Sequence, residues 1–175
     1  MRTLLIGGAR SGKSALAQRW AAERSRNVCY IATATVSDEE MAVRIDAHRR
    51  ERPDHWRLHE ESTQLAAALR NEARQGELLL IDCLTLWTSN CLWPAPADVA
   101  ADVTGWHRER DAFLAALRAT TTDVIVVSNE VGTGIVPENP AARLFRDEHG
   151  RLNQQVAAVC DEVFLVTAGL ALRLK

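Results

Sequence analysis

The sequence lacks the features that mark several large classes of protein. Its four cysteines, Cys29, Cys83, Cys91 and Cys160, form no C-x-x-C pair and no metal-ligand spacing, which favours free buried thiols over disulfides or a zinc site. The formal net charge is only −2, so no basic field argues for nucleic acid or an anionic membrane as a partner. No apolar run approaches the length of a membrane span, and no repeat or low-complexity segment is present.

The composition is that of an ordinary globular protein. Of the 175 residues, 47% are hydrophobic and 25% are charged, which is enough for one domain with a sizeable core. We therefore expect a single domain over residues 1–175. The first apolar residues lead directly into a glycine-rich loop, so we expect no signal peptide and a cytoplasmic protein with reduced thiols.

The most informative stretch is the first fourteen residues, MRTLLIGGARSGKS. An apolar run ends at Gly7, and four residues separate Gly7 from Gly12-Lys13-Ser14, which is the G-x-x-x-x-G-K-S spacing of a phosphate-binding loop. Such a run predicts a buried parallel strand, and the residues from Lys13 to about Glu23 predict a helix whose amino end faces the phosphates. We expect Lys13 to reach the outer phosphates of a nucleoside triphosphate and Ser14 to hold Mg²⁺. The expected nucleotide contacts of this loop are Gly7, Gly8, Ala9, Arg10, Ser11, Gly12, Lys13 and Ser14.

Strands and helices alternate along the rest of the chain. Further strands are expected at 28–32, 77–82, 123–127 and 163–166, with an edge strand at 170–175. Helices are expected between Ser37 and Pro53, at 62–73 with Ser62 as cap, at 86–93, at 98–118, and from the Asn139 cap towards Cys160. Residues 131–138 are expected to form a loop. The alternation predicts an α/β fold of the P-loop NTPase type, a mostly parallel sheet with helices on both faces.

Ligands of such sheets bind beyond the carboxyl ends of the strands. That rule brings the phosphate loop, residues 33–35, Asp82 and Asn129-Glu130 to one rim. Asp82 follows four apolar residues, as expected of a Mg²⁺-binding carboxylate, although acidic residues at strand ends also cap helices or form ion pairs. The role of Glu130 stays open between metal, substrate hydroxyl and loop anchoring.

One histidine has a setting suited to chemistry. His48 shares a predicted helix face with Arg44 and Arg52, and Arg49 and Arg50 are adjacent. Neighbouring cations disfavour protonation of the imidazole, which leaves a neutral nucleophile able to attack phosphorus. A solvated basic helix that happens to carry a histidine has the same spacing, so the spacing alone does not decide.

The other histidines give weaker signals. His107 and His149 lie among charged residues, and we expect both on solvated faces. His55 and His59 flank Trp56 in a segment without a clear pattern.

Several segments together resemble one family, the bifunctional adenosylcobinamide kinase/adenosylcobinamide-phosphate guanylyltransferases of cobalamin biosynthesis. The segments are GGARSGKS, YIATA, DEEMAVRIDAHRRERPDHW, LLIDCLTLW, VSNEVGTGIVPENPAARLFRDEHGRLNQ and DEVFLVTAG. They cover nearly the whole chain. The resemblance implies phosphorylation of the aminopropanol hydroxyl of adenosylcobinamide by ATP or GTP, followed by transfer of GMP from GTP onto that phosphate.

The resemblance also implies which residues act. GMP passes through a covalent intermediate on His48, next to Ala47, where some relatives carry a second histidine. Mg²⁺ is the implied cofactor, held by Ser14 and Asp82, and the implied assembly is a homotrimer. The further nucleotide contacts that the resemblance implies are Thr33, Ala34, Thr35, Arg49, Arg50, Glu51, Arg52, Glu60 and Asp82.

Two other functions are compatible with the residues themselves. One is a simple small-molecule kinase of the P-loop class in which His48 is idle. The other is a nucleotide-switched binding module with residues 131–138 as the switch. For the bulky corrinoid, Trp87, Trp93 and the 131–138 loop are candidate contacts, although a tryptophan is more often a core residue.

Overall fold

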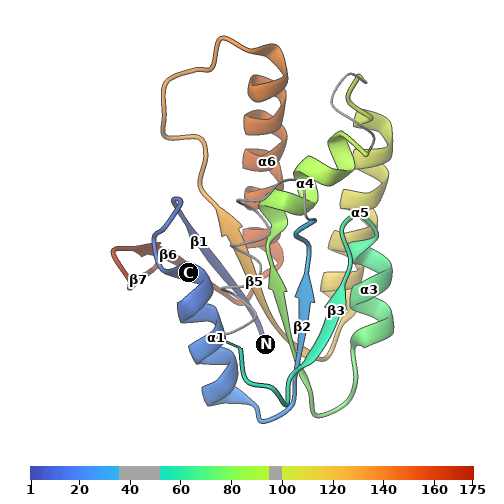
Figure 1. Ribbon diagram of the computed structural model, residues 1–175, viewed down its shortest axis with the longest axis vertical. Helices are drawn as coiled ribbons and strands as arrows, with labels where there is room; N and C mark the ends of the chain where they lie inside the picture. The colour runs from blue at the N-terminus through green and yellow to red at the C-terminus, as the bar shows by residue number, and fades with distance from the viewer. Residues whose placement is uncertain (36–51, 95–99) are drawn as a thin grey trace.

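The computed structural model describes residues 1–35, 52–94 and 100–175. Those residues form one seven-stranded sheet in the order β3-β2-β4-β5-β1-β6-β7 (Figure 1). The strands are β1 Arg2–Gly7, β2 Val28–Ala32, β3 Arg57–Glu60, β4 Leu78–Asp82, β5 Asp123–Asn129, β6 Glu162–Thr167 and β7 Leu170–Arg173. All neighbouring strands are parallel except β6 and β7, which form an antiparallel pair.

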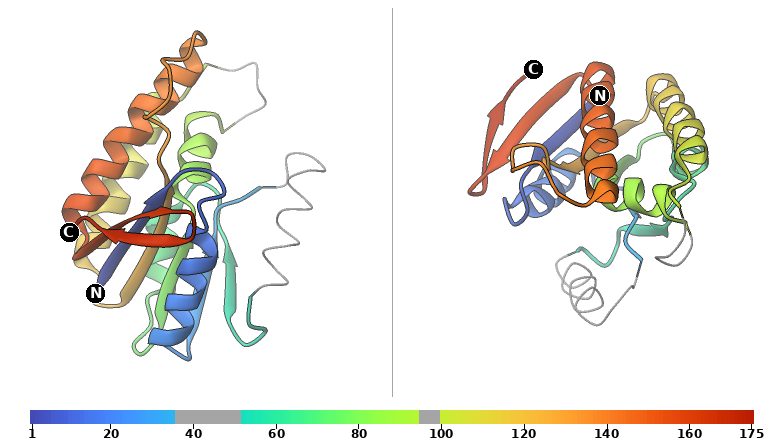
Figure 2. Two further views of the ribbon diagram at one scale, coloured as in Figure 1. Left: turned by 90° about the vertical axis from the view of Figure 1, so that its left-hand side faces the viewer. Right: turned by 90° about the horizontal axis from the view of Figure 1, so that it is seen from above.

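Helices cover both faces of the sheet, as the alternation of elements predicted. They are α1 Lys13–Arg24, α3 Leu65–Glu72, α4 Leu84–Leu92, α5 Val103–Ala119 and α6 Pro140–Val159. Helix α1 packs on one face, and the other four lie on the opposite face (Figure 2). Successive strand residues point into different cores: Leu4 joins the cluster under α3–α6, while Leu5 joins the cluster under α1.

The strands predicted from apolar runs are confirmed, and one strand was missed. Strand β3 has the sequence RLHE, with alternating half-buried and exposed residues and no apolar run. Ion pairs hold this edge strand in place, because Arg57 contacts Glu72 and Glu77, each at 2.6 Å. A charged edge strand of four residues does not have the hydrophobic pattern by which strands are recognised.

The predicted helix starts were less accurate than the helices themselves. Ser62 does not cap α3, which begins at Leu65. The carboxylate of Glu61 instead accepts hydrogen bonds from the backbone of Thr63 and Gln64 at 2.8 and 2.9 Å, and the amide of Ala66 donates to Glu109 of α5 at 2.8 Å. Glu61 is the sequence neighbour of Ser62, whereas Glu109 is distant in the chain, so no local pattern announces its contact.

Two further helices also differ at their starts. Helix α4 begins at Leu84, two residues earlier than expected, and α5 begins at Val103, where Asp102 accepts a hydrogen bond from the amide of Gly105 at 2.8 Å. The Asn139 cap of α6 is confirmed, because its side chain accepts from the amides of Ala141 and Ala142.

Two expectations concern the chain as a whole. The four cysteines are free; three are buried and Cys83 is half-buried. Within the described ranges, no helix is both long and apolar enough to cross a membrane. Most of the helix predicted between Ser37 and Pro53 falls on residues 36–51, which lie outside the described residues.

Candidate functional site: a phosphate loop beside two strand ends

The glycine-rich loop joins β1 to α1 at the carboxyl edge of the sheet (Figure 1). Gly12 and Arg10 adopt left-handed backbone conformations, with φ of 90° and 56°, so the chain turns sharply into the helix. A Cβ atom on Gly7 would lie 2.3 Å from the carbonyl oxygen of Val166, so only glycine fits beside β6. The loop therefore has the tight turn and the helix amino end that phosphate binding requires.

Two polar side chains of the loop are buried and have few or no hydrogen-bond partners among the described residues. The Lys13 ammonium donates to the carbonyl of Gly8 at 3.1 Å, and the residue is only 8% exposed. Burial lowers the pKa of Lys13, and the carboxylate of Asp82 opposes that shift. The Ser11 hydroxyl is buried and has no hydrogen-bond partner within the structure described. Unsatisfied buried polar atoms are costly, and a phosphate oxygen would satisfy both groups.

Asp82 ends β4 on the α1 side of the sheet, because it continues the alternation of Leu78 and Leu80. The hydroxyl of Tyr30 donates to its Oδ2 atom at 2.9 Å. Burial raises the pKa of Tyr30 well above its ordinary value, and the negative charge of Asp82 adds to that shift, so the phenol stays protonated.

The oxygen ligands near the loop suit Mg²⁺. Asp82 offers a carboxylate and Ser14 a hydroxyl at the first turn of α1, and Mg²⁺ is usually held by one or two carboxylates together with substrate phosphates. No group of three or more His, Cys, Asp or Glu side chains capable of holding a metal occurs in ranges 1–35, 52–94 and 100–175. This donor set fits a metal that arrives with a nucleotide rather than one held in a protein cage.

The end of β2 is bound tightly to the end of β4. The Thr33 hydroxyl donates to the carbonyl of Cys83 at 2.7 Å and accepts from the amide of Cys83 at 2.8 Å. The amide of Asn90 donates to the carbonyl of Thr33 at 2.9 Å. Thr33 is fully buried and its hydroxyl is engaged with the backbone, whereas Ala34 is half-buried and Thr35 is exposed at the rim.

The remaining predicted nucleotide contacts are divided between described and undescribed residues. The Arg52 guanidinium lies 4.4 Å from the centroid of the Tyr30 ring, and its Nη1 atom is buried without a partner in the ranges described. Glu60 and Asp82 flank Ala32 from the two neighbouring strands, so they lie at the same level of the rim. His48, Arg49, Arg50 and Glu51 lie outside the described residues.

The end of β5 completes the rim. Asn129 pairs with Gly7 of β1, and the amide of Glu130 donates to the carbonyl of Gly7 at 2.9 Å. The Glu130 carboxylate accepts from the amide of Gly132, so loop anchoring is the one of its three candidate roles that a contact supports. Residues 131–138 form the expected loop, in which Ile135 is 96% exposed.

We predicted His149 on a solvated face, and this prediction is wrong. The residue is fully buried behind the end of β5. Its Nε2 atom lies 3.0 Å from the carbonyl of Asn129, which can only accept, so Nε2 carries the proton. Burial lowers the pKa of His149 to about 4, although the hydrogen bond to Asn129 and the charge of Glu130 act in the opposite direction. The neutral imidazole of His149 therefore has a structural role in the folded protein.

Hydrogen bonds from α4 and β5 converge on this histidine of α6. We call the His149 cluster the side chains of His149, Thr85, Thr88, Ser128 and Asn153. Thr85 and Ser128 lie 3.3 and 3.2 Å from Nε2, and Thr88 lies 3.2 Å from Nδ1. Asn153 accepts from Ser128 at 2.6 Å and donates to the carbonyl of Asn129 at 2.9 Å. The cluster fixes the backbone of β5 where it meets the phosphate loop.

The other aromatic and histidine predictions have mixed outcomes. Trp87 is fully buried in the core, so it cannot contact a corrinoid, and Trp93 is half-buried against the same core. His107 is half-buried and lies 3.0 Å from the Glu148 carboxylate, while His59 lies 3.4 Å from Glu72.

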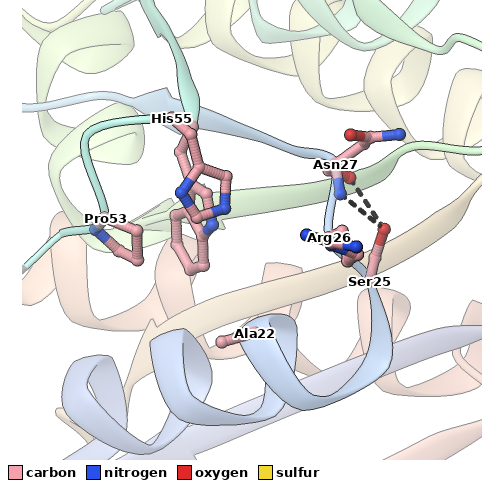
Figure 3. A pocket seen from close by; sticks show the side chains of 7 residues that line it. Ala22, Ser25, Arg26, Asn27, Pro53 and His55 are labelled. Atoms are coloured by element: carbon pink, nitrogen blue, oxygen red, sulfur yellow. Dashed lines mark hydrogen bonds between the residues drawn. The ribbon is translucent and has the colours of Figure 1, made fainter.

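A separate hollow lies far from this chemistry. It has a volume of about 670 Å³ and is lined by Ala22, Ser25, Arg26, Asn27, Pro53, His55 and Trp56 (Figure 3). Because α1 starts at the phosphate loop and ends at Arg24, this hollow lies at the other end of the sheet. It contains none of the phosphate-loop residues and neither Asp82 nor Glu130, so the rim is the better candidate site.

Comparison with solved structures agrees with this geometry. The RadB recombinase has a TM-score of 0.50 and 17% identity, over 94% of this chain and 73% of that one. An ATPase from the type III secretion system of pathogenic bacteria has a TM-score of 0.53 and 12% identity, over 95% of this chain and 52% of that one. At such low identity the likeness concerns the fold alone, and it confirms the P-loop NTPase-like architecture.

Sequence comparison is more specific. The family model described as cobinamide kinase / cobinamide phosphate guanyltransferase matches residues 3–174. The chain is 48% identical over 175 residues to the bifunctional adenosylcobalamin biosynthesis protein CobP of Pseudomonas aeruginosa, covering 100% of this chain and 98% of the relative. It is 40% identical over 182 residues to CobU of Escherichia coli, with 100% of both chains covered. The chain therefore belongs to the family of cobinamide kinases/cobinamide phosphate guanyltransferases, the bifunctional enzymes of cobalamin biosynthesis.

Proposed function

We propose that residues 1–175 act as one domain that phosphorylates the aminopropanol hydroxyl of adenosylcobinamide and then transfers GMP onto the new phosphate through His48. The observation that carries the proposal is Lys13, which is buried at the start of α1 and feels the charge of Asp82. The family model matches residues 3–174 of the same chain. Both reactions need a triphosphate held at the same loop, and ATP or GTP serves the first while GTP serves the second.

In the kinase step the loop residues Gly7–Ser14 bind the phosphates through backbone amides and the Lys13 ammonium. Ser14 and Asp82 would hold Mg²⁺, which when bound neutralises charge on the phosphate oxygens. The substrate hydroxyl oxygen forms a bond to the γ-phosphorus and releases its proton to the solvent. The bond from that phosphorus to the bridging oxygen breaks, and the nucleoside diphosphate leaves.

In the second step an imidazole nitrogen of His48 attacks the α-phosphorus of GTP. A P–N bond forms, the bond to the β-phosphate oxygen breaks and pyrophosphate leaves. An oxygen of the substrate phosphate then attacks the same phosphorus, which breaks the P–N bond and releases adenosylcobinamide-GDP. The nucleotide would also contact residues 33–35, Arg49, Arg50, Glu51, Arg52 and Glu60. The Nη1 atom of Arg52 has no partner in the part of the chain that the structure describes, which supports that role, since a phosphate oxygen would satisfy it.

The setting of the enzyme is part of the proposal. We expect a homotrimer in the cytoplasm, as the family resemblance implies. Sedimentation of the purified chain would test the assembly.

GTP labelled at the α-phosphate tests the chemistry directly. The protein should acquire a label that acid removes and alkali does not, as expected of a phosphoramidate. His48→Ala should abolish the label, whereas His55→Ala, which changes an exposed histidine near Trp56, should leave it intact. A simple kinase would move only the γ-phosphate to a small acceptor, and a nucleotide switch would transfer neither group; either result would overturn the guanylyl-histidine mechanism.

A further inference from the structure

Among the described strand residues, Tyr30 is the only buried one whose side chain contacts two predicted site groups. These groups are the carboxylate of Asp82 and the guanidinium of Arg52. It lies in β2, and its ring packs in the core beneath α1 with 6% exposure. In the register of β2 and β4, Ala32 pairs with Asp82 and Tyr30 pairs with Leu80. Tyr30 is therefore two residues behind the rim on the strand next to Asp82, and its long side chain reaches forward to that carboxylate.

The hydrogen bond to Asp82 has a fixed direction. An ionised carboxylate only accepts, so the phenol donates its single proton to Oδ2 over 2.9 Å. A carboxylate held by one oxygen in this way has its other oxygen turned to a defined position. Partners that orient a metal ligand in this manner are part of a metal site, because they limit the geometries that the ligand can adopt.

The ring of Tyr30 makes a second contact, with Arg52. The Arg52 guanidinium carbon lies over the ring, 4.4 Å from its centroid, while Nη1 remains buried and unpartnered in the residues described. Attraction between a cation and the ring face holds the guanidinium over the ring, and Nη1 can still donate to a ligand. One aromatic side chain thus holds a carboxylate with its hydroxyl and a guanidinium with its face.

We propose that Tyr30 is a positioning residue that fixes Asp82 and Arg52 relative to one another, so that metal and nucleotide are bound in a single geometry. The inference rests on the proposed function, in which Asp82 holds Mg²⁺ and Arg52 contacts the nucleotide. It assigns separate tasks to the two parts of the side chain: the hydroxyl acts on the metal and the ring acts on the nucleotide.

Two substitutions separate these tasks. Tyr30→Phe keeps the ring and the core volume but removes the donor to Asp82. We expect the dissociation constant of Mn²⁺ from the protein–GTP complex, followed by electron paramagnetic resonance, to rise about tenfold. GTP affinity in EDTA, measured by calorimetry, should stay within about twofold of the original. Tyr30→Leu removes the ring as well, and we expect it to weaken GTP binding in EDTA by roughly fivefold, in line with the loss of a partly buried cation–π contact.

The controls distinguish this inference from the proposed function. Thr3→Val also removes one fully buried hydroxyl, at the amino end of β1 where Thr3 accepts from Arg24 at 2.9 Å, and it should change neither Mn²⁺ nor GTP binding. Asp82→Asn should weaken Mn²⁺ binding. If Asp82→Asn does so and Tyr30→Phe does not, Tyr30 has no positioning role although the metal assignment holds. If Asp82→Asn leaves Mn²⁺ binding unchanged, the metal assignment and this inference are both wrong.

Discussion

The phosphate loop and the end of β5 are neighbours in the sheet, but they differ in how their buried polar groups are satisfied. Gly7 pairs with Asn129, so the two regions meet directly. In the loop, as far as the structure describes the chain, the Ser11 hydroxyl has no partner and the Lys13 ammonium donates only to a carbonyl of the loop itself. Behind β5, hydrogen bonds surround the imidazole of His149.

The difference assigns separate tasks to the two regions. A buried donor without a partner costs about 1–3 kcal/mol, so it persists where a ligand compensates it. A fully satisfied network instead makes the backbone rigid. We infer that the loop binds while the His149 cluster holds the neighbouring strand end still, and substitutions in each region should have opposite signatures.

The largest expected effect is on the binding region. Lys13→Ala removes the buried ammonium that faces the phosphates, and we expect the kinase rate to fall by about a hundredfold or more. The free energy of unfolding should change little, because Gly8 is the only hydrogen-bond partner of the ammonium among the described residues. Lys175→Ala, which alters the chain's other lysine, is the matched control. Wild-type kinase activity in Lys13→Ala would remove the loop from the reaction.

The next effect is on the rigid region. His149→Phe preserves the stacking with Phe145, whose ring is 5.4 Å away, but deletes the bonds to Asn129 and the threonines. We expect a loss of about 2–3 kcal/mol in the free energy of unfolding, measured in urea, because buried partners are left unpaired. The kinase rate should fall far less than in Lys13→Ala. An unchanged urea midpoint would show that the cluster does not stabilise the fold.

The same histidine predicts a pH dependence. Its folded-state pKa of about 4 lies below the ordinary 6.5, so the unfolded chain binds the proton more tightly. The stability that neutral His149 contributes is full above pH 6.5 and is lost as the pH falls to about 4, by about 3 kcal/mol in total. In His149→Phe the unfolding free energy should fall less over this interval. Parallel pH profiles for wild type and variant would refute the assignment, and His55→Ala serves as control.

The smallest effect sharpens the comparison most. Ser11→Ala removes a hydroxyl that has no partner in the described chain, so without nucleotide the melting temperature should stay the same or rise slightly. GTP affinity should fall roughly fivefold, reducing the shift in melting temperature on GTP addition. Ser25→Ala, which removes a hydroxyl bonded to Asn27 at the far end of α1, should leave that shift unchanged. A lower melting temperature for Ser11→Ala without GTP would contradict the absence of a partner.

Local sequence predicted the frame of the fold well. Apolar runs that end in glycine or polar residues located β1, β2, β4 and β5, because a strand buried on both faces has few other sequences available. The rule that ligands bind at the carboxyl ends of strands then brought Asp82 and Asn129 beside the loop. These inferences depend on single segments and on a general rule, so they need no knowledge of side-chain contacts.

Most of the failures concern contacts between distant segments. Ser62 loses the capping role partly to its sequence neighbour Glu61 and partly to Glu109 of the distant helix α5. Tyr30 was not singled out, since only the order of the strands places it beside Asp82. For His149 a signal existed: it precedes Leu152, Asn153 and Val156 at helical spacing, so it shares their buried face. Its charged neighbours in sequence concealed that periodicity.

The capping of α3 by Glu109 has a consequence for the order of folding. Helix α3 has only 8 residues and no side-chain cap of its own, so it is too short to persist alone in water. The acceptor for its Ala66 amide arrives only when α5, of 17 residues, has docked. We therefore expect α3 to become stable only once α5 has docked, and amide exchange should show α3 opening whenever α5 detaches from the sheet.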